Sequence, residues 1–137
     1  MKIIETVGIV LKTMDFKEKD SILTFLTRDA GKKAGVLHGG KSVRSGNAAK
    51  AELFVINHFE YSEKPSAEMV RIRKCELLES FPPLRKNYAK ILHANYFSEL
   101  MLQCEIPAVE SQEYFDLLMD TLAQLSTAKT GIEIKFN

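Results

Sequence analysis

Residues 21–61 read SILTFLTRDAGKKAGVLHGGKSVRSGNAAKAELFVINHFEY, and this stretch decides the fold. Two runs in it are rich in apolar, β-branched and aromatic residues, at residues 21–27 and 52–61. The run between them, at residues 32–38, places Ala34 and Val36 at alternate positions and Leu37 on the opposite face. Runs of this length and pattern predict β-strands. A four-residue turn after the first run predicts a hairpin. The glycine- and serine-rich residues 39–47 predict a long loop before the last run.

Two further strand patterns flank this stretch. Residues 5–12 place Val7, Ile9 and Leu11 at alternate positions, which is the period of a half-buried strand. Residues 69–78 form the last predicted strand, after a turn that contains a proline. Five short strands with one long connection between the third and the fourth predict a small barrel, and we expect the five-stranded OB-fold.

The hydrophobic period changes after two consecutive prolines, Pro82 and Pro83. From Leu84 onward, apolar residues recur at steps of three and four, which predicts a helix that runs to about Cys104. Residues 111–126 show the same period and begin with a serine suited to cap a helix. We therefore expect two helices whose apolar stripes pack on each other, on the barrel, or on a part of the protein outside this sequence.

This change of period predicts two parts: an OB-fold nucleic-acid-binding domain over residues 1–80 and the start of a helical domain over residues 81–137. The expected fold class is α+β, with a five-stranded OB-fold β-barrel followed by an incomplete α-helical domain. Thr130 and Glu133 have the spacing of a capping box, but few residues follow them. We therefore expect a third helix to begin there, and the chain to be a fragment or a natural truncation.

Composition places the chain among globular proteins. It has 137 residues, of which 45% are hydrophobic and 27% are charged, with a net charge of +1. Residues 1–80 contain 14 Lys and Arg against 11 Asp and Glu, whereas residues 81–137 contain 5 against 7. Any attraction to nucleic acid must therefore come from local asymmetry of charge, and it should be sensitive to salt.

The most uneven distribution of charge lies in residues 30–51, which contain no Asp or Glu. The cations of this stretch are Lys32, Lys33, Lys41, Arg44 and Lys50. A basic, glycine-rich segment without acids is a candidate surface for phosphate groups. The alternative is a solvated loop whose charge only keeps the protein soluble.

The last predicted strand adds two arginines to this candidate surface. Arg71 and Arg73 alternate with Val70 and Ile72, so the two arginines should share the outer face of the barrel. The alternative for each is an ordinary salt bridge across an exposed sheet, for example to Glu52 or Glu60.

The sequence offers no active site. Cys75 and Cys104 are far apart and lie outside any CxxC pair, so no zinc site is predicted. The three histidines fall on separate predicted elements, and no phosphate-binding loop is present. We therefore expect a protein that is not an enzyme and uses no metal or cofactor. The two thiols and the lack of an apolar run of about 20 residues predict a cytoplasmic protein without a membrane span.

Several segments have an order and spacing typical of a known family. They are ETVGIVLKTMDFKEKDSILTFLTRDAGK, HGGKSVRS, CELLESFPPLRKN, YFSELM and YFDLLMDTL. This order resembles the N-terminal half of the bacterial recombination mediator RecO. The resemblance implies an OB barrel followed by a helical domain, binding of single- and double-stranded DNA, and strand annealing. It also implies joint action with RecR and single-strand-binding protein to load RecA onto DNA.

The resemblance also assigns DNA contacts to this sequence. Lys41 and Arg44 match the basic loop of the family, and Lys12, Lys32 and Lys33 are carried over with them. With the two strand arginines, the predicted DNA-binding residues are Lys12, Lys32, Lys33, Lys41, Arg44, Arg71 and Arg73. The loop has fewer cations than is common in the family. The helical domain of the family usually carries a zinc-binding cluster of cysteines, and this sequence has no such cluster.

Two other functions are compatible with the sequence alone. One is a protein-interaction OB scaffold, which docks a partner or forms a homodimer through the apolar stripe of its helices. The other is an RNA-binding OB module, which differs from the first hypothesis only in its nucleic acid.

Overall fold

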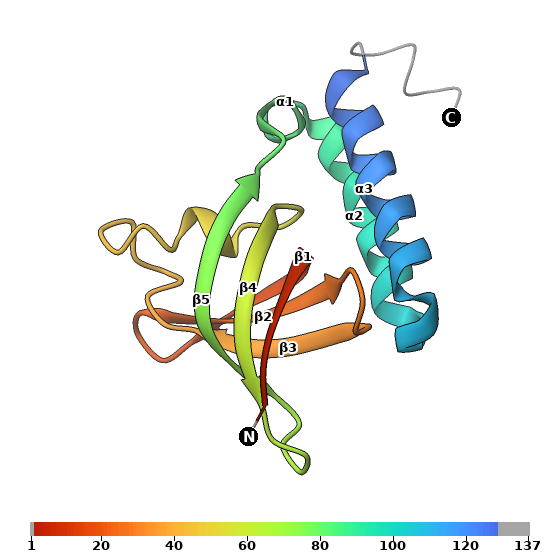
Figure 1. Cartoon of the computed structure of the whole chain (residues 1–137). Helices are drawn as coiled ribbons and strands as arrows, with labels where there is room; N and C mark the ends of the chain where they lie inside the picture. The colour runs from red at the N-terminus through yellow and green to blue at the C-terminus, as the bar shows by residue number, and fades with distance from the viewer. Residues whose placement is uncertain (1, 129–137) are drawn as a thin grey trace.

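The computed structural model describes residues 2–128, and its N-terminal part is a closed five-stranded barrel (Figure 1). The strands are β1 (Lys2–Phe16), β2 (Asp20–Thr27), β3 (Lys32–Leu37), β4 (Ile56–Glu63) and β5 (Val70–Glu79). Their order around the barrel is β1-β2-β3-β5-β4, and every pairing is antiparallel except that of β3 with β5. The predicted five-stranded OB-fold barrel and the α+β class are confirmed.

Helices follow the barrel and cover one of its sides (Figure 1). The helical elements are η1 (Ala49–Ala51), α1 (Pro82–Arg85), α2 (Tyr88–Gln103), η2 (Ala108–Glu110) and α3 (Ser111–Thr127). In residues 2–128, no helix is long and apolar enough to cross a membrane. The predicted helix start at Thr130 lies outside the described residues. The division into domains at residues 80 and 81 stays a prediction.

The interior of the barrel is filled by alternate side chains of the strands. Leu23 and Phe25 of β2 and Phe59 of β4 are fully buried there. The rings of Phe25 and Phe59 stack with their centroids 4.0 Å apart. A bulge between Val10 and Lys12 bends β1, so that its first half pairs with β4 and its second half with β2. This bend lets one long strand close the barrel.

Closure of the barrel depends on a glycine where β3 meets β5. The two strands pair only at Gly35 with Val70 and at Val36 with Arg71. A Cβ atom on Gly35 would lie 2.7 Å from the carbonyl oxygen of Val70. Only glycine allows the two backbones to approach this closely.

A second core lies between the barrel and the helices. Phe115, Leu118, Leu122 and Leu125 of α3 are buried in it, as their spacing predicted. Ile9 of β1 contributes to the same core from the barrel. Burying four large apolar side chains of one helix stabilises its position by several kcal/mol, at roughly 1.5–3 kcal/mol for each.

Hydrogen bonds also fix the helices to the turn between β2 and β3. The Ser111 hydroxyl donates to the carbonyl oxygen of Thr27 at 2.6 Å and accepts from the amide of Gly31 at 2.9 Å. Gly31 has φ +73°, and a Cβ atom there would lie 2.7 Å from the carbonyl oxygen of Ile106. Ser111 was predicted to cap α3, but its side chain joins the helix to the barrel.

The predicted helix from Leu84 to Cys104 is divided in the structure. α1 ends at Arg85, and Asn87 caps α2 by accepting a hydrogen bond from the amide of Lys90. The face of α2 that packs inward mixes small and polar residues with the apolar Phe97 and Met101, and the buried Lys90 donates to the carbonyl oxygen of Ser126 at 3.0 Å. Only part of the apolar stripe predicted for this helix therefore belongs to the core.

Three residues of the apolar stripe predicted for this helix, Tyr88, Leu92 and Leu100, lie on the outer side of α2. Tyr88 is 76% exposed, Leu92 50% and Leu100 41%, and Tyr96 lies between them with 63% exposed. Both sides of α2 carry apolar residues, so the period alone could not show which side faces the barrel.

The predicted fourth strand begins later than the sequence indicated. Residues 53–55 are apolar but belong to a turn in which Phe54 has φ +72°, so β4 starts at Ile56. Phe54 and Val55 are buried all the same, because they close the end of the barrel beside η1.

Candidate nucleic-acid interface

One outer face of the barrel combines apolar and basic side chains. Strand register places Lys12, Thr24 and Ala34 side by side across β1, β2 and β3. The next row toward the β3–β4 loop is Met14, Ile22, Val36 and Arg71, from β1, β2, β3 and β5. Phe16 of β1 follows in the third row. We call these eight residues the outer face. The neighbouring Leu23 side chain points into the barrel, and its partner Gly35 lies at an inward-facing position.

The outer face has an apolar middle with a cation at each side. Met14 is 48% exposed, and Ile22, Val36 and Phe16 are half-buried, so part of each is accessible. Lys12 and Arg71 are exposed on the two flanking strands. Such a face suits a chain of bases and phosphates, because bases pack on apolar and aromatic surfaces while cations hold the backbone.

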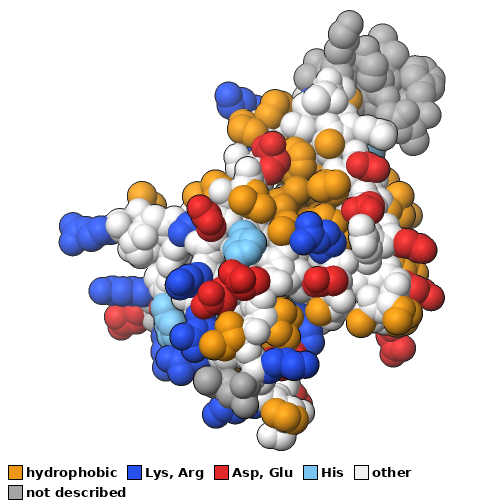
Figure 2. All heavy atoms as spheres, in the orientation of Figure 1, with side chains coloured by type: hydrophobic (Ala, Val, Ile, Leu, Met, Phe, Trp, Pro, Cys, Tyr) orange, Lys and Arg blue, Asp and Glu red, His pale blue; other side chains and the backbone are white. Residues whose placement is uncertain are grey.

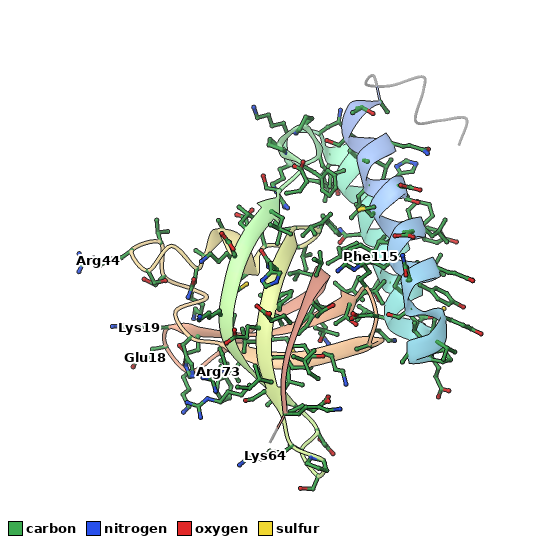
Figure 3. The ribbon with its side chains drawn as sticks, viewed as in Figure 1. Glu18, Lys19, Arg44, Lys64, Arg73 and Phe115 are labelled. Carbon is green, nitrogen blue, oxygen red and sulfur yellow. The ribbon has the colours of Figure 1, made fainter. Side chains whose placement is uncertain are left out.

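Two connections extend the outer face at one end. The β1–β2 turn, residues 17–19, carries Lys17 and Lys19, and the β3–β4 loop carries Lys41 and Arg44. Lys17 Nζ lies 5.3 Å from the centroid of the Phe16 ring. Lys19 and Arg44 project from the same end of the molecule (Figure 3). The predicted basic loop therefore adjoins cations from a different part of the chain.

The β3–β4 loop is attached to the β1–β2 turn. The amide of Lys41 donates to the carbonyl oxygen of Lys19 at 3.0 Å, and Lys41 Nζ lies 3.5 Å from Asp15 Oδ2. Asp20 Oδ1 accepts from the amide of Gly39 at 2.9 Å, and Oδ2 is 3.3 Å from His38 Nδ1. The Gly39 hydrogen bond and the contact with His38 lower the pKa of Asp20. A carboxylate thus holds the loop where its cations meet those of the turn.

Charge differs between the two sides of the molecule. Basic side chains gather at the end formed by the β1–β2 turn, the β3–β4 loop and the start of β5, whereas acidic side chains lie along α3 (Figure 2). Residues 104–128 contain five acids and no Lys or Arg. A polyanion should therefore approach the barrel end and avoid the helices.

Two of the predicted contact residues are engaged within the protein. Lys32 Nζ donates to the carbonyl oxygens of Met101 at 2.9 Å and Leu102 at 2.8 Å, and also to that of Cys104. These are groups at the C-terminal end of α2, where a cation is favourable. Lys33 Nζ forms an ion pair with Glu63. The two lysines point to opposite sides of β3, as strand geometry predicts, and both ammonium groups have partners.

The two arginines of β5 differ in their contacts. Arg73 Nε lies 3.5 Å from Glu60 Oε2, so the salt-bridge alternative holds for Arg73. Arg71 has no ion pair with any described residue and lies on the outer face. Of the two, Arg71 is the more available to a phosphate group.

Comparison with known proteins assigns the family. The family model described as "Recombination protein O N terminal" matches residues 1–81, which is more than half of the chain. The chain belongs to the RecO family. The matched residues include the whole barrel and therefore the outer face and the loop.

Curated relatives carry the same family name. The DNA repair protein RecO of Acaryochloris marina is 36% identical over 121 residues, covering 88% of this chain and 41% of that protein. The DNA repair protein RecO of Syntrophus aciditrophicus is 29% identical over 127 residues, covering 93% of this chain and 49% of that protein. A Synechococcus relative of the same name is 33% identical over 128 residues. The chain thus spans less than half the length of these RecO proteins.

The sequence patterns did not predict part of the outer face of this RecO-family chain. The first strand was predicted to end at Lys12, but β1 continues to Phe16 and places Met14 and Phe16 on the outer face. Lys17 and Lys19 lie outside the predicted strands and outside the basic stretch of residues 30–51. The signal was present, since Lys12, Met14 and Phe16 follow a period of two, but the polar and charged residues of segment 13–20 are also typical of a turn.

Proposed function

We propose that this chain is a non-enzymatic DNA-binding module that acts in recombinational repair. Its relatives are named DNA repair proteins, and the matching family model is described as that of a recombination protein. The outer face and the adjoining turn and loop would hold the sugar-phosphate backbone. Single-stranded DNA would lie across β1, β2 and β3, and duplex DNA would contact mainly the cations. Strand annealing and the loading of a recombinase, with RecR-like and single-strand-binding partners, belong to this proposal.

The observation that carries the proposal is the composition of the outer face. Lys12 and Arg71 flank an accessible apolar strip, and Phe16 offers a ring to a base. Stacking of a base on an aromatic side chain contributes about 1–3 kcal/mol and tolerates any sequence. Contacts of this kind fix a strand without reading its bases, which suits a protein that acts on DNA of any sequence.

Annealing would follow from neutralised charge and needs no covalent step. Two DNA strands repel each other through their phosphates, and cations of one surface reduce that repulsion. The basic end carries Lys17, Lys19, Lys41 and Arg44 on two adjoining connections. A strand held on the outer face would leave this end accessible to a second strand.

A pair of charge-matched double variants tests the proposal. Lys12→Ala with Arg71→Ala removes both flanking cations, whereas Lys64→Ala with Lys86→Ala removes two exposed lysines elsewhere. Fluorescence anisotropy with a labelled single-stranded oligonucleotide should show at least about tenfold weaker binding for the first variant, because two phosphate contacts are lost. The control variant should bind nearly as the wild type does. Equal loss in both variants would contradict a localised site.

A second candidate function is self-association through the exposed side of α2. Tyr88, Leu92, Tyr96 and Leu100 are four residues apart, so they form one apolar stripe. In an antiparallel pair with a second copy, Leu92 would face Tyr96 of that copy. The ends also differ in charge, with Lys86 before the stripe and Glu99 near its end. A two-fold arrangement satisfies both patterns.

The oligomeric state distinguishes this second candidate. Leu92→Glu should convert a dimer into a monomer, measured by gel filtration with light scattering, because a charge would be buried in the stripe. Leu117→Glu on α3 is the control, since Leu117 is 59% exposed outside the stripe. A wild-type monomer at all concentrations would refute self-association.

A further inference from the structure

β3 and β5 diverge beyond the two residue pairs that close the barrel. The two strands pair at Val36 and Arg71 and then separate, because β3 ends at Leu37 while β5 continues. A cavity of about 320 Å³ lies where they separate. Leu37, Ile72 and Cys75 line it, and all three belong to the interior core of the barrel or pack against it. We call this cavity the barrel mouth.

The rim of the barrel mouth is basic. His38, Arg73 and Lys74 line the cavity, and each has an exposed side chain. His38 comes from the start of the β3–β4 loop and the other two from β5. Burial raises the pKa of the Cys75 thiol, and the positive charge of Lys50 opposes this shift only in part.

The cavity therefore has apolar side chains below and basic and polar side chains above, with Asn47 among them. Arg73 and His38 also contact the carboxylates of Glu60 and Asp20, so a phosphate group would compete with these exposed contacts. The arrangement fits a ligand with one apolar end and one anionic end.

We propose that the barrel mouth accepts one unpaired nucleotide of a DNA strand, with its base against Leu37, Ile72 and Cys75 and its phosphate on His38, Arg73 and Lys74. The inference rests on the proposed DNA-binding function and adds to it a site for a single base. The volume is at the lower end of the range for small-molecule sites, so it suits one nucleotide and no stacked pair.

The position of the barrel mouth supports this assignment. Arg71, on the outer face, directly precedes the residues of β5 that form the floor and rim. A strand that crosses the outer face toward the loop therefore reaches the barrel mouth with its next nucleotide. Mouths of barrels are common ligand sites, because the strands diverge there and leave room between rigid walls.

A base can enter the barrel mouth only if it is free of its stack. In a duplex each base is paired and stacked, and turning it out costs a few kcal/mol. Single-stranded DNA avoids most of that cost. The barrel mouth therefore gives the module a preference for single strands that phosphate contacts alone would not provide.

Alkylation of the two cysteines tests the inference in the intact chain. Cys75 lines the barrel mouth, whereas Cys104 follows α2 at a distant position and serves as the internal control. Burial raises the pKa of the Cys75 thiol to about 12, so its reaction with iodoacetamide is slow and can be followed by mass spectrometry of peptides. The probes are octathymidylate, an abasic octamer of equal charge, a blunt duplex and thymidine monophosphate.

At saturating octathymidylate, alkylation of Cys75 should slow by at least about threefold, because an inserted base covers the thiol. The rate at Cys104 should not change. Neither the abasic octamer nor the duplex should protect Cys75, and millimolar thymidine monophosphate should protect it in part. Equal protection by the abasic octamer or by the duplex would overturn the inference, since neither can insert a base.

The same samples separate failure of the inference from failure of the proposed function. Anisotropy reports whether the octamer binds at all. If octathymidylate binds but leaves Cys75 as reactive as before, only the inference of a nucleotide site in the barrel mouth is overturned. Absence of binding by every DNA, with no protection by the mononucleotide, would overturn both. Arg73→Ala with Lys74→Ala, at exposed positions, should reduce the protection by at least about threefold at a fixed octamer concentration, since the phosphate loses two cations.

Discussion

Replacing Lys32 by methionine removes an ammonium group that contacts the end of a helix distant in sequence. Lys32 Nζ donates to the carbonyl oxygens of Met101, Leu102 and Cys104, the last of which lies beyond the helix end. Hydrogen bonds from a charged group contribute about 1.5–3 kcal/mol, and a cation near a helix C-terminus about 0.3–1 kcal/mol. Methionine retains most of the apolar stem. Since Lys32 is only half-buried, we expect Lys32→Met to lower the free energy of unfolding by about 2 kcal/mol.

The assay is urea denaturation followed by circular dichroism, with DNA binding measured on the same protein. At a typical slope of about 2 kcal/mol per molar urea, the midpoint should fall by roughly 1 M. The matched control is Lys33→Met, which removes an ion pair between half-exposed groups. Such a pair contributes about 0–1 kcal/mol, so the midpoint should fall by less than roughly 0.5 M.

DNA binding decides between the two roles of Lys32. If its ammonium group holds the end of α2, Lys32→Met should leave the affinity for a single-stranded oligonucleotide within about twofold of the wild type, since no phosphate contact is lost. If Lys32→Met kept its stability and lost DNA affinity as Lys12→Ala does, this reasoning would be refuted. It would place Lys32 among the DNA contacts that the family resemblance implied.

Three further predictions concern single positions. Gly35→Ala should lower the free energy of unfolding by about 1–3 kcal/mol in urea melts, because the new Cβ would crowd the carbonyl oxygen of Val70; an unchanged midpoint would contradict this. Phe16→Ala should weaken binding of single-stranded DNA by about 1 kcal/mol or more in anisotropy titrations, and unchanged binding would exclude stacking. The pKa of Asp20 is lowered from 3.8, so its contact with the Gly39 amide should persist above pH 3.8 and be lost as the pH falls below it. The Gly39 amide resonance in NMR should report this loss, and a midpoint at or above 3.8 would contradict it.

Much of the barrel could be predicted because strands leave a clear period in the sequence. The alternation of Val70 and Ile72 with Arg71 and Arg73 correctly indicated which side chains face inward. Strand ends were less certain. Phe54 is buried although it lies outside any strand. The apolar segment around it therefore resembles β4 in composition, although the backbone turns at Phe54.

The candidate site was harder to predict, because contacts distant in sequence decide which cations are available. Nothing near Lys32 in the sequence indicates that the end of α2 lies beside it, since Met101, whose carbonyl oxygen it contacts, is 69 residues later. The basic loop was recognised from composition alone, but its partners Asp15 and Lys19 come from the end of β1 and from the β1–β2 turn. Sequence patterns find charges, whereas only the fold shows which charges already have partners.

The salt dependence of single-stranded DNA binding tests the central claim most directly. The observed association constant should fall as salt rises, with a slope of log K against log salt of about −0.7 for each phosphate contact. Lys41→Glu with Arg44→Glu should weaken binding and reduce the size of the slope by about 1.4, because two contacts are lost. An affinity and a slope equal to those of the wild type would contradict the claim that phosphates bind where the loop meets the barrel.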